Sequence, residues 1–261
     1  MDSMDMTLAP CTASHVGAPN SYDPIAFSQM SRLVADMRHL YAERKQAARE
    51  LARAHHEALV RLAMAAEMRD DDTGAHIVRM GYLAEALAQE IGLPSQEAAM
   101  LRRAAPLHDV GKIGIPDRVL KKAGPLTGDE REVMKRHPEL GAGIFGRSRV
   151  PLLQMAAEVA LTHHERWDGT GYPNGLAGEQ IPVHGRVAAV ADFFDALTMD
   201  RCYRDAYDDD TALAMLREQR GTAFDPDLVD AFVDAAPRMV ALRDRINAGA
   251  PSVGALMEAL L

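Results

Sequence analysis

The sequence from residue 25 to residue 68 contains neither proline nor glycine. These two residues are the strongest helix breakers, so the run predicts one long helix or two helices in tandem. Apolar side chains recur with a rough four-and-three spacing that Arg44 interrupts: Leu33, Met37, Leu40, Ala47, Leu51, Ala54, Ala58 and Leu62. This spacing fits an amphipathic helix packed on its own domain, or a parallel coiled coil between two chains. The alanine-rich seam is weak in either case.

Helical patterns with clear stops continue along the rest of the chain, at residues 76–91, 95–107, 151–164 and 183–200. Two further helices are expected between residues 210 and 248. Ser95 is expected to cap one helix, and Thr127 with Glu130 has the form of a capping box for another. No strand pattern or internal repeat appears, which predicts an all-α fold. Residues 1–24 lack periodicity and are expected to form a disordered leader.

Composition narrows the classes of function. The formal net charge is −9, whereas general nucleic-acid binding needs a basic surface, so no polymeric nucleic acid is expected as a partner. Any anionic ligand must instead be attracted by local cations. There are only two cysteines, and the sequence shows neither a signal peptide nor an uncharged apolar run of membrane-spanning length. We therefore expect a cytoplasmic protein.

Histidine is concentrated in one part of the chain. Five of the ten histidines fall between positions 76 and 164, namely His76, His108, His137, His163 and His164. Alone, His108-Asp109 could be a cap or a core ion pair, and His137 a solvent-exposed helix residue. His163 and His164, however, can face one cavity only where a helix frays, because neighbouring helical side chains diverge by about 100°.

Carboxylates accompany these histidines. Asp72 lies four residues before His76, and Asp192 falls within an apolar helix, where a carboxylate is costly to bury unless it is paired or bound to a metal. Imidazole and carboxylate together suit Zn, Mn, Fe or Ni. An aspartate between two histidine groups can bridge two ions, which predicts a two-metal site able to act on a phosphoryl group.

Five segments between about Leu62 and Tyr207 carry a family resemblance, in family order and spacing: RDDDTGAHIVRM, LHDVGKIGIPD, MKRHPELG, HHERWDGTGYPNGL and VADFFDALTMDRCYR. They resemble the HD-GYP family, the cyclic-di-GMP phosphodiesterase branch of the HD phosphohydrolases. The resemblance implies an HD-type helical bundle with a GYP loop extension, preceded by a long N-terminal helix. The expected organisation is a leader at 1–24, a helical or coiled-coil segment at 25–66, and a catalytic domain with C-terminal helices at 67–261.

The resemblance also implies a set of site residues. One metal would be held by His76, His108, Asp109 and Asp192, and a second by Asp109, His137, His163 and His164. A hydroxide between the metals would attack phosphorus and open the 3′–5′ phosphodiester of cyclic di-GMP to give pGpG, with slow further cleavage to GMP. The substrate contacts implied are Lys112, at the scissile phosphate, and Tyr172, Arg201 and Arg204.

Three departures from the family pattern bear on these expectations. Asp72 replaces the glutamate that helps to hold a third metal in many members, so two metals are expected and a third less so. Cys202 and Arg204 replace a usual proline and lysine. No receiver domain is expected ahead of the catalytic part, and a signalling partner in trans is a candidate source of input. The apolar spacing from Leu33 to Leu62 predicts a homodimer through the N-terminal helix.

Two alternatives to the phosphodiesterase remain open. One is a catalytically inactive cyclic-dinucleotide-binding or partner-docking protein with the same fold. The other is an HD phosphohydrolase acting on nucleoside polyphosphates, against which His137, His163-His164 and the GYP loop stand.

Overall fold

The computed structural model describes residues 24–67, 69, 75–200 and 205–249. None of these residues belongs to a β-strand, as the sequence patterns predict. The longer helices are α1 (Pro24–Glu67), α2 (Ala75–Glu90), α3 (Ser95–Ala104), α7 (Pro151–Thr162), α8 (Val183–Leu197), α9 (Asp209–Glu218), α10 (Pro226–Asp234) and α11 (Ala236–Gly249). Shorter helical elements are η2 (Ala105–Leu107), η3 (Val110–Gly114), α4 (Asp117–Leu120), α5 (Gly128–Met134), α6 (His137–Phe145) and η4 (Gly178–Gln180).

The chain divides into two compact units, Met1–Leu51 and Ala52–Leu261. The division falls inside α1, which is a single helix rather than two in tandem. The expected boundary between residues 66 and 67 stays a prediction. In the first unit the apolar residues of α1 are exposed, including Leu33 at 54%, Met37 at 62% and Leu40 at 64%.

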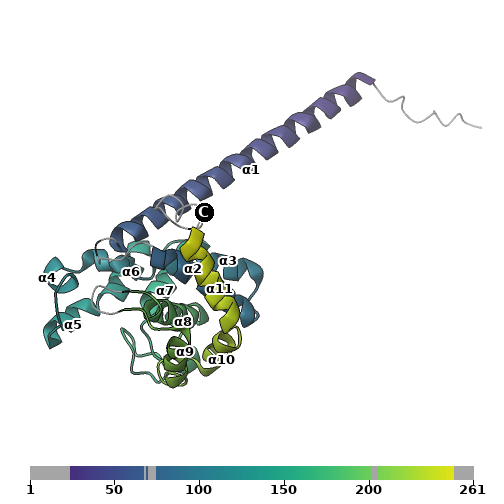
Figure 1. Cartoon of the computed structure of the whole chain (residues 1–261). Helices are drawn as coiled ribbons and strands as arrows, with labels where there is room; N and C mark the ends of the chain where they lie inside the picture. The colour runs from purple at the N-terminus through teal and green to yellow at the C-terminus, as the bar shows by residue number, and fades with distance from the viewer. Residues whose placement is uncertain (1–23, 68, 70–74, 201–204, 250–261) are drawn as a thin grey trace, which may run out of the picture. The chain divides into compact units, whose positions relative to one another are not determined.

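The second unit is built around α2, which packs against α3, α8, α10 and α11 (Figure 1). Eleven of its sixteen residues are buried, as expected for a helix surrounded by others. The last turns of α1 join this core through Val60, Ala63 and Met64. A second layer, in which α6 packs against η3 and α7, adjoins it.

Two local predictions have different outcomes. The capping box is confirmed, because the Thr127 hydroxyl accepts the Glu130 N–H and the Glu130 carboxylate accepts the Thr127 N–H. The Ser95 cap is wrong, because α3 begins at Ser95 itself and Pro94 occupies the N-cap position without a side-chain hydrogen bond.

The C-terminal part of the chain also differs from expectation. Three helices, α9 to α11, replace the two expected between residues 210 and 248.

Among the described residues, no helix is both long and apolar enough to span a bilayer.

Candidate metal centre

Four of the expected ligands converge where three elements meet. Asp109 lies between η2 and η3, His137 is the first residue of α6, and His163 and His164 follow the last residue of α7. One ligand atom from each of the four lies within 4.8 Å of the others. The His163-His164 pair thus sits where α7 ends, as the side-chain geometry requires.

A second group consists of His76, His108 and Asp192, and one ligand atom from each of them also lies within 4.8 Å of the others. His76 is the second residue of α2, His108 follows η2, and Asp192 projects from α8. Nε2 of His76 is 3.4 Å from Oδ1 of Asp192, and Nε2 of His108 is 3.9 Å from the same oxygen.

Asp109 faces both groups. Its Oδ1 lies 3.1 Å from Nε2 of His137 and 3.5 Å from Nε2 of His163, whereas its Oδ2 lies 3.2 Å from Nε2 of His108. Nζ of Lys112 is 2.8 Å from Oδ2. The two oxygens of one carboxylate are therefore divided between the two groups, which is the arrangement that a bridging ligand needs.

Hydrogen bonds to the backbone orient three of the rings. Nδ1 of His108 lies 3.0 Å from the Ala105 carbonyl, Nδ1 of His137 2.8 Å from that of Met134, and Nδ1 of His163 3.0 Å from that of Ala160. A carbonyl oxygen only accepts, so each Nδ1 carries the proton and donates it. Nε2 then presents a lone pair to the centre, as in the histidine ligands of metalloproteins.

Side-chain oxygens, not backbone, orient His76. Its Nδ1 lies 2.7 Å from Oδ2 of Asp195, and Arg79 donates to the same carboxylate from Nε at 2.6 Å and from an Nη at 2.9 Å. Sequence reasoning missed both residues. The available signal was spacing, since Asp195 follows Asp192 by three residues and Arg79 follows His76 by three, which places each pair on one helical face.

The protonation states of His163, His164 and Asp109 favour a cation site. Burial lowers the pKa of His163 and takes that of His164 well below its usual value, so both rings are neutral near pH 7. Burial alone would raise the pKa of Asp109, but Lys112 and His108 hold it well below its usual range. Burial alone would lower the pKa of His76, but Asp195 outweighs it and raises the pKa to about 10; a bound cation would compete with that proton for Nε2.

These donors fit divalent transition metals. Nε2 of His108 and Oδ1 of Asp109 are buried and have no hydrogen-bond partner among the described residues, a costly state for polar atoms. Neutral imidazole with carboxylate is the donor set that suits Zn, Mn, Fe and Ni. The cluster can therefore hold metal.

The motif glycine of HDVGK permits the close packing of the centre. A Cβ on Gly111 would lie 2.0 Å from the His137 carbonyl oxygen and 2.4 Å from the Gly141 nitrogen. Only glycine allows η3 and α6 to approach so closely, and this approach brings Asp109 to His137.

The GYP loop is fastened beside His164. The buried Glu165 carboxylate accepts N–H bonds from Asn174 at 2.8 Å and Leu176 at 3.0 Å. Tyr172 stacks on the His164 ring, with centroids 4.8 Å apart and planes at 25°. Nζ of Lys135 lies 5.7 Å from the centre of the Tyr172 ring. An aromatic face and an ammonium group thus adjoin the cluster.

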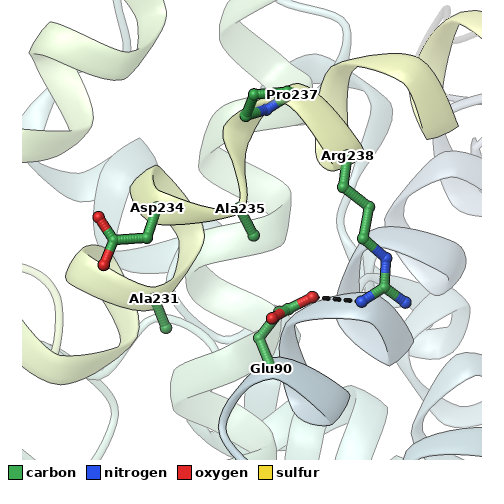
Figure 2. Close-up of a pocket in the computed structure, with 6 residues that line it drawn as sticks. All are labelled: Glu90, Ala231, Asp234, Ala235, Pro237 and Arg238. Carbon is green, nitrogen blue, oxygen red and sulfur yellow. Dashed lines mark hydrogen bonds and ion pairs between the residues drawn. The ribbon is translucent and has the colours of Figure 1, made fainter.

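Three expected site residues, Asp72, Arg201 and Arg204, lie outside the described residues, as does Cys202. A separate hollow of about 520 Å³ lies where α10 and α11 meet the end of α2, with Glu90 and Arg238 paired across it (Figure 2). None of the expected site residues lines this hollow.

Comparison with known proteins finds a family model and several curated relatives. Residues 29–228 match the family model described as HD domain. The cyclic di-GMP phosphodiesterase response regulator RpfG of Xanthomonas campestris pv. campestris is 50% identical over 184 residues, covering 70% of this chain and 49% of that protein. The 3′3′-cGAMP-specific phosphodiesterase 2 of Vibrio cholerae is 45% identical over 187 residues, covering 72% of this chain and 36% of that protein. The chain thus spans half or less of the length of these relatives.

A solved structure supports the fold. The crystal structure of a cyclic GMP-AMP-specific phosphodiesterase from Vibrio cholerae matches with a TM-score of 0.56 at 20% identity, covering 78% of this chain and 53% of that one. The expected all-α HD-type fold is confirmed. Because the family model spans most of the sequence, and the five motifs lie within it, the chain belongs to the HD domain family, in its HD-GYP branch.

Proposed function

We propose that this chain is a metal-dependent phosphodiesterase that opens the 3′–5′ phosphodiester bond of cyclic di-GMP, in bacterial second-messenger signalling in the cytoplasm. The observation that carries the proposal is the division of the two Asp109 oxygens between two neighbouring ligand groups. Such a pair of groups suits two ions that clamp one phosphoryl centre.

His76, His108, Asp109 and Asp192 would hold one ion, and Asp109, His137, His163 and His164 the other. When bound, the ions would supply Lewis acidity and lower the pKa of water so that a nucleophile forms near neutral pH. Iron, manganese, zinc or nickel would serve, and a third ion through Asp72 is less expected.

Lys112 would act on the substrate phosphate. Its ammonium group lies 2.8 Å from Asp109, within the centre, and its side chain is only partly exposed. A fixed positive charge here would stabilise the negative charge that develops on the phosphoryl oxygens as the bond to the leaving oxygen breaks. With the metals, it would also attract an anion to a chain of net charge −9.

Tyr172 offers a flat face for a guanine base, and Arg201 and Arg204 would bind phosphates or guanine edges. Several relatives are cyclic di-GMP phosphodiesterases, which supports that substrate. The similarity to a 3′3′-cGAMP-specific enzyme favours that dinucleotide as a second candidate. Both substrates present the same 3′–5′ linkage, so one centre would serve either.

The exposed apolar stripe of α1 supports a homodimer through that helix, with a signalling partner in trans able to act on it. Leu33, Met37 and Leu40 are more than half exposed and follow four-and-three spacing. A second copy of the helix would bury them.

The test is turnover by the purified, manganese- or iron-loaded protein. Each dinucleotide would be supplied separately and the products separated by chromatography over time. We expect pGpG from cyclic di-GMP, with GMP appearing later, and a loss of about 10²- to 10³-fold in kcat for Lys112→Ala. The control Lys121→Ala makes the same charge change at an exposed position and should leave turnover unchanged. Equal turnover by wild type and Lys112→Ala would contradict the assigned role, and no hydrolysis of either dinucleotide would refute the proposed function.

A further inference from the structure

Arg69, two residues beyond the end of α1, is bound to the segment that follows Asp109. One Nη donates to the carbonyls of Lys112 at 3.1 Å and Ile113 at 2.7 Å. The other donates to the Ile115 carbonyl at 2.8 Å and to Oδ1 of Asp117 at 2.7 Å, and Nε donates to the same oxygen at 3.1 Å. The five N–H donors of a guanidinium group are thereby all used.

The acceptors explain why an arginine is needed. Three of them are the carbonyls of residues 112, 113 and 115, at or just beyond the end of η3, where the last carbonyls of a helical turn have few partners within the turn and carry partial negative charge. A planar fork can reach several carbonyls and a carboxylate at once. A lysine ammonium has three donors on one atom and cannot span the same set.

The same segment carries Lys112. Its amide donates to the Asp109 carbonyl at 2.9 Å, and its carbonyl accepts from both Arg69 and the Ile115 amide. The Lys112 side chain is a flexible four-carbon stem, so the place of its ammonium depends on how firmly its backbone is held. Arg69 holds that backbone through three of its carbonyls, those of residues 112, 113 and 115.

The end of α1, which precedes Arg69 in the chain, lies in the core. Val60, Ala63 and Met64, in the last turns of α1, are buried. Glu67, the final residue of α1, is 4% exposed, and burial raises the pKa of its carboxyl. The end of α1, two residues before Arg69, is therefore packed in the core.

We propose that Arg69 is a positioning residue, which holds Lys112 in place for the reaction and ties its segment to the end of α1. This inference rests on the proposed function, in which Lys112 stabilises the substrate phosphate. It adds a route by which a change in α1 reaches the centre, because the end of α1 and the Lys112 segment are joined through one side chain.

A double-mutant cycle in the full-length, metal-loaded protein tests this. Arg69→Ala should lower kcat by roughly 10- to 100-fold, because displacements near 1 Å have effects of that size, while metal content stays unchanged. In a Lys112→Ala background the same change should alter kcat by less than about twofold, since the residue through which Arg69 acts is gone. Arg69→Lys should restore activity only in part.

The control is Arg238→Ala. Arg238 also joins two elements through an ion pair, with Glu90 at the far end of α2 (Figure 2). Glu90 is fourteen residues from His76 on one helix, or about 21 Å at 1.5 Å per residue. This variant should leave kcat and the cycle unchanged.

Hydrogen exchange supplies a readout that does not need turnover. Arg69→Ala should speed exchange of the amides of residues 112–115 while those of α8 keep wild-type rates. If these amides keep wild-type exchange, or if Arg69→Ala lowers kcat equally in both backgrounds, the inference is overturned. A wild type that hydrolyses no cyclic dinucleotide would refute the proposed function alone, and the exchange result would still decide whether Arg69 holds the segment.

Discussion

Removing the Asp195 carboxylate should damage the protein in two separable ways. Asp195 is completely buried and Arg79 is 1% exposed. Asp195→Ala therefore leaves the Arg79 guanidinium in the core without its carboxylate partner. Among the described residues, its remaining hydrogen bond is to Asn247 at 3.2 Å. The substitution also removes the acceptor that holds Nδ1 of His76 at 2.7 Å. The first effect concerns stability, and the second concerns metal binding.

The expected loss of stability follows from the burial. Breaking a buried ion pair by removing one partner costs about 3–5 kcal/mol, because the other charge stays uncompensated. For a unit of this size each kcal/mol lowers Tm by about 2–4 °C, so the metal-free protein should melt roughly 6–20 °C lower. Thermal unfolding followed by circular dichroism in the presence of a chelator measures this. The exposed pair Arg220–Asp230 is the control, and Asp230→Ala should leave Tm almost unchanged because water screens an exposed ion pair.

A second variant separates the two effects. Asp195→Ala with Arg79→Met removes both charges and should recover most of the lost stability. Metal affinity should nevertheless remain about 10- to 100-fold below wild type, because no acceptor fixes the His76 ring. Competition with a chromophoric chelator gives that affinity. A double variant that binds metal as tightly as wild type, or a single variant that loses less than about 1 kcal/mol, would refute the reasoning.

Three further predictions concern other parts of the molecule. Gly111→Ala should destabilise the fold by about 1–3 kcal/mol and reduce metal binding, since its Cβ would lie 2.0 Å from the His137 carbonyl oxygen. The control is Gly143→Ala on α6, whose Cβ would have nothing within 4 Å and should be tolerated. Equal melting temperatures for the two variants would contradict this prediction. His184 bonds Glu158 at 2.6 Å and Glu97 at 2.8 Å, and the Glu158 bond raises its pKa. The unfolding free energy of wild type should exceed that of His184→Gln most just below pH 6.5, and this difference should shrink as pH rises through the raised pKa of His184. Denaturant unfolding that gives a constant difference from about pH 5 to 9 would contradict this. Leu33→Glu with Leu40→Glu should turn a dimer into a monomer by light scattering, and a monomeric wild type would exclude pairing through α1.

The sequence predicted which residues converge in the centre because their chemistry is rare and local. Several histidines close to aspartates within apolar helical segments are typical of metal centres, and five motifs together fix their order. Asp195 was missed because its spacing from Asp192 places both on one face of α8 but does not show which of them meets His76. Arg69 was missed because its partners lie more than forty residues away and are mostly backbone carbonyls.

The C-terminal helices illustrate a different limit. Asp234 ends α10 and Ala236 begins α11 without an intervening glycine, and Pro237 falls in the first turn of α11, where proline is tolerated. A bend between two such helices has little local signature, so the pattern predicts a single helix there. Both α10 and α11 pack against α2, a long-range contact that the local sequence does not show.

Metal content per chain, measured by mass spectrometry on wild type, Asp109→Ala and His164→Ala, tests the two-group centre most directly. Asp109 faces both groups, whereas His164 belongs to one of them. We expect two ions in wild type, about one in His164→Ala, and close to none in Asp109→Ala, with helical circular dichroism retained in all three. Wild-type metal content in a folded Asp109→Ala protein would contradict the two-group centre.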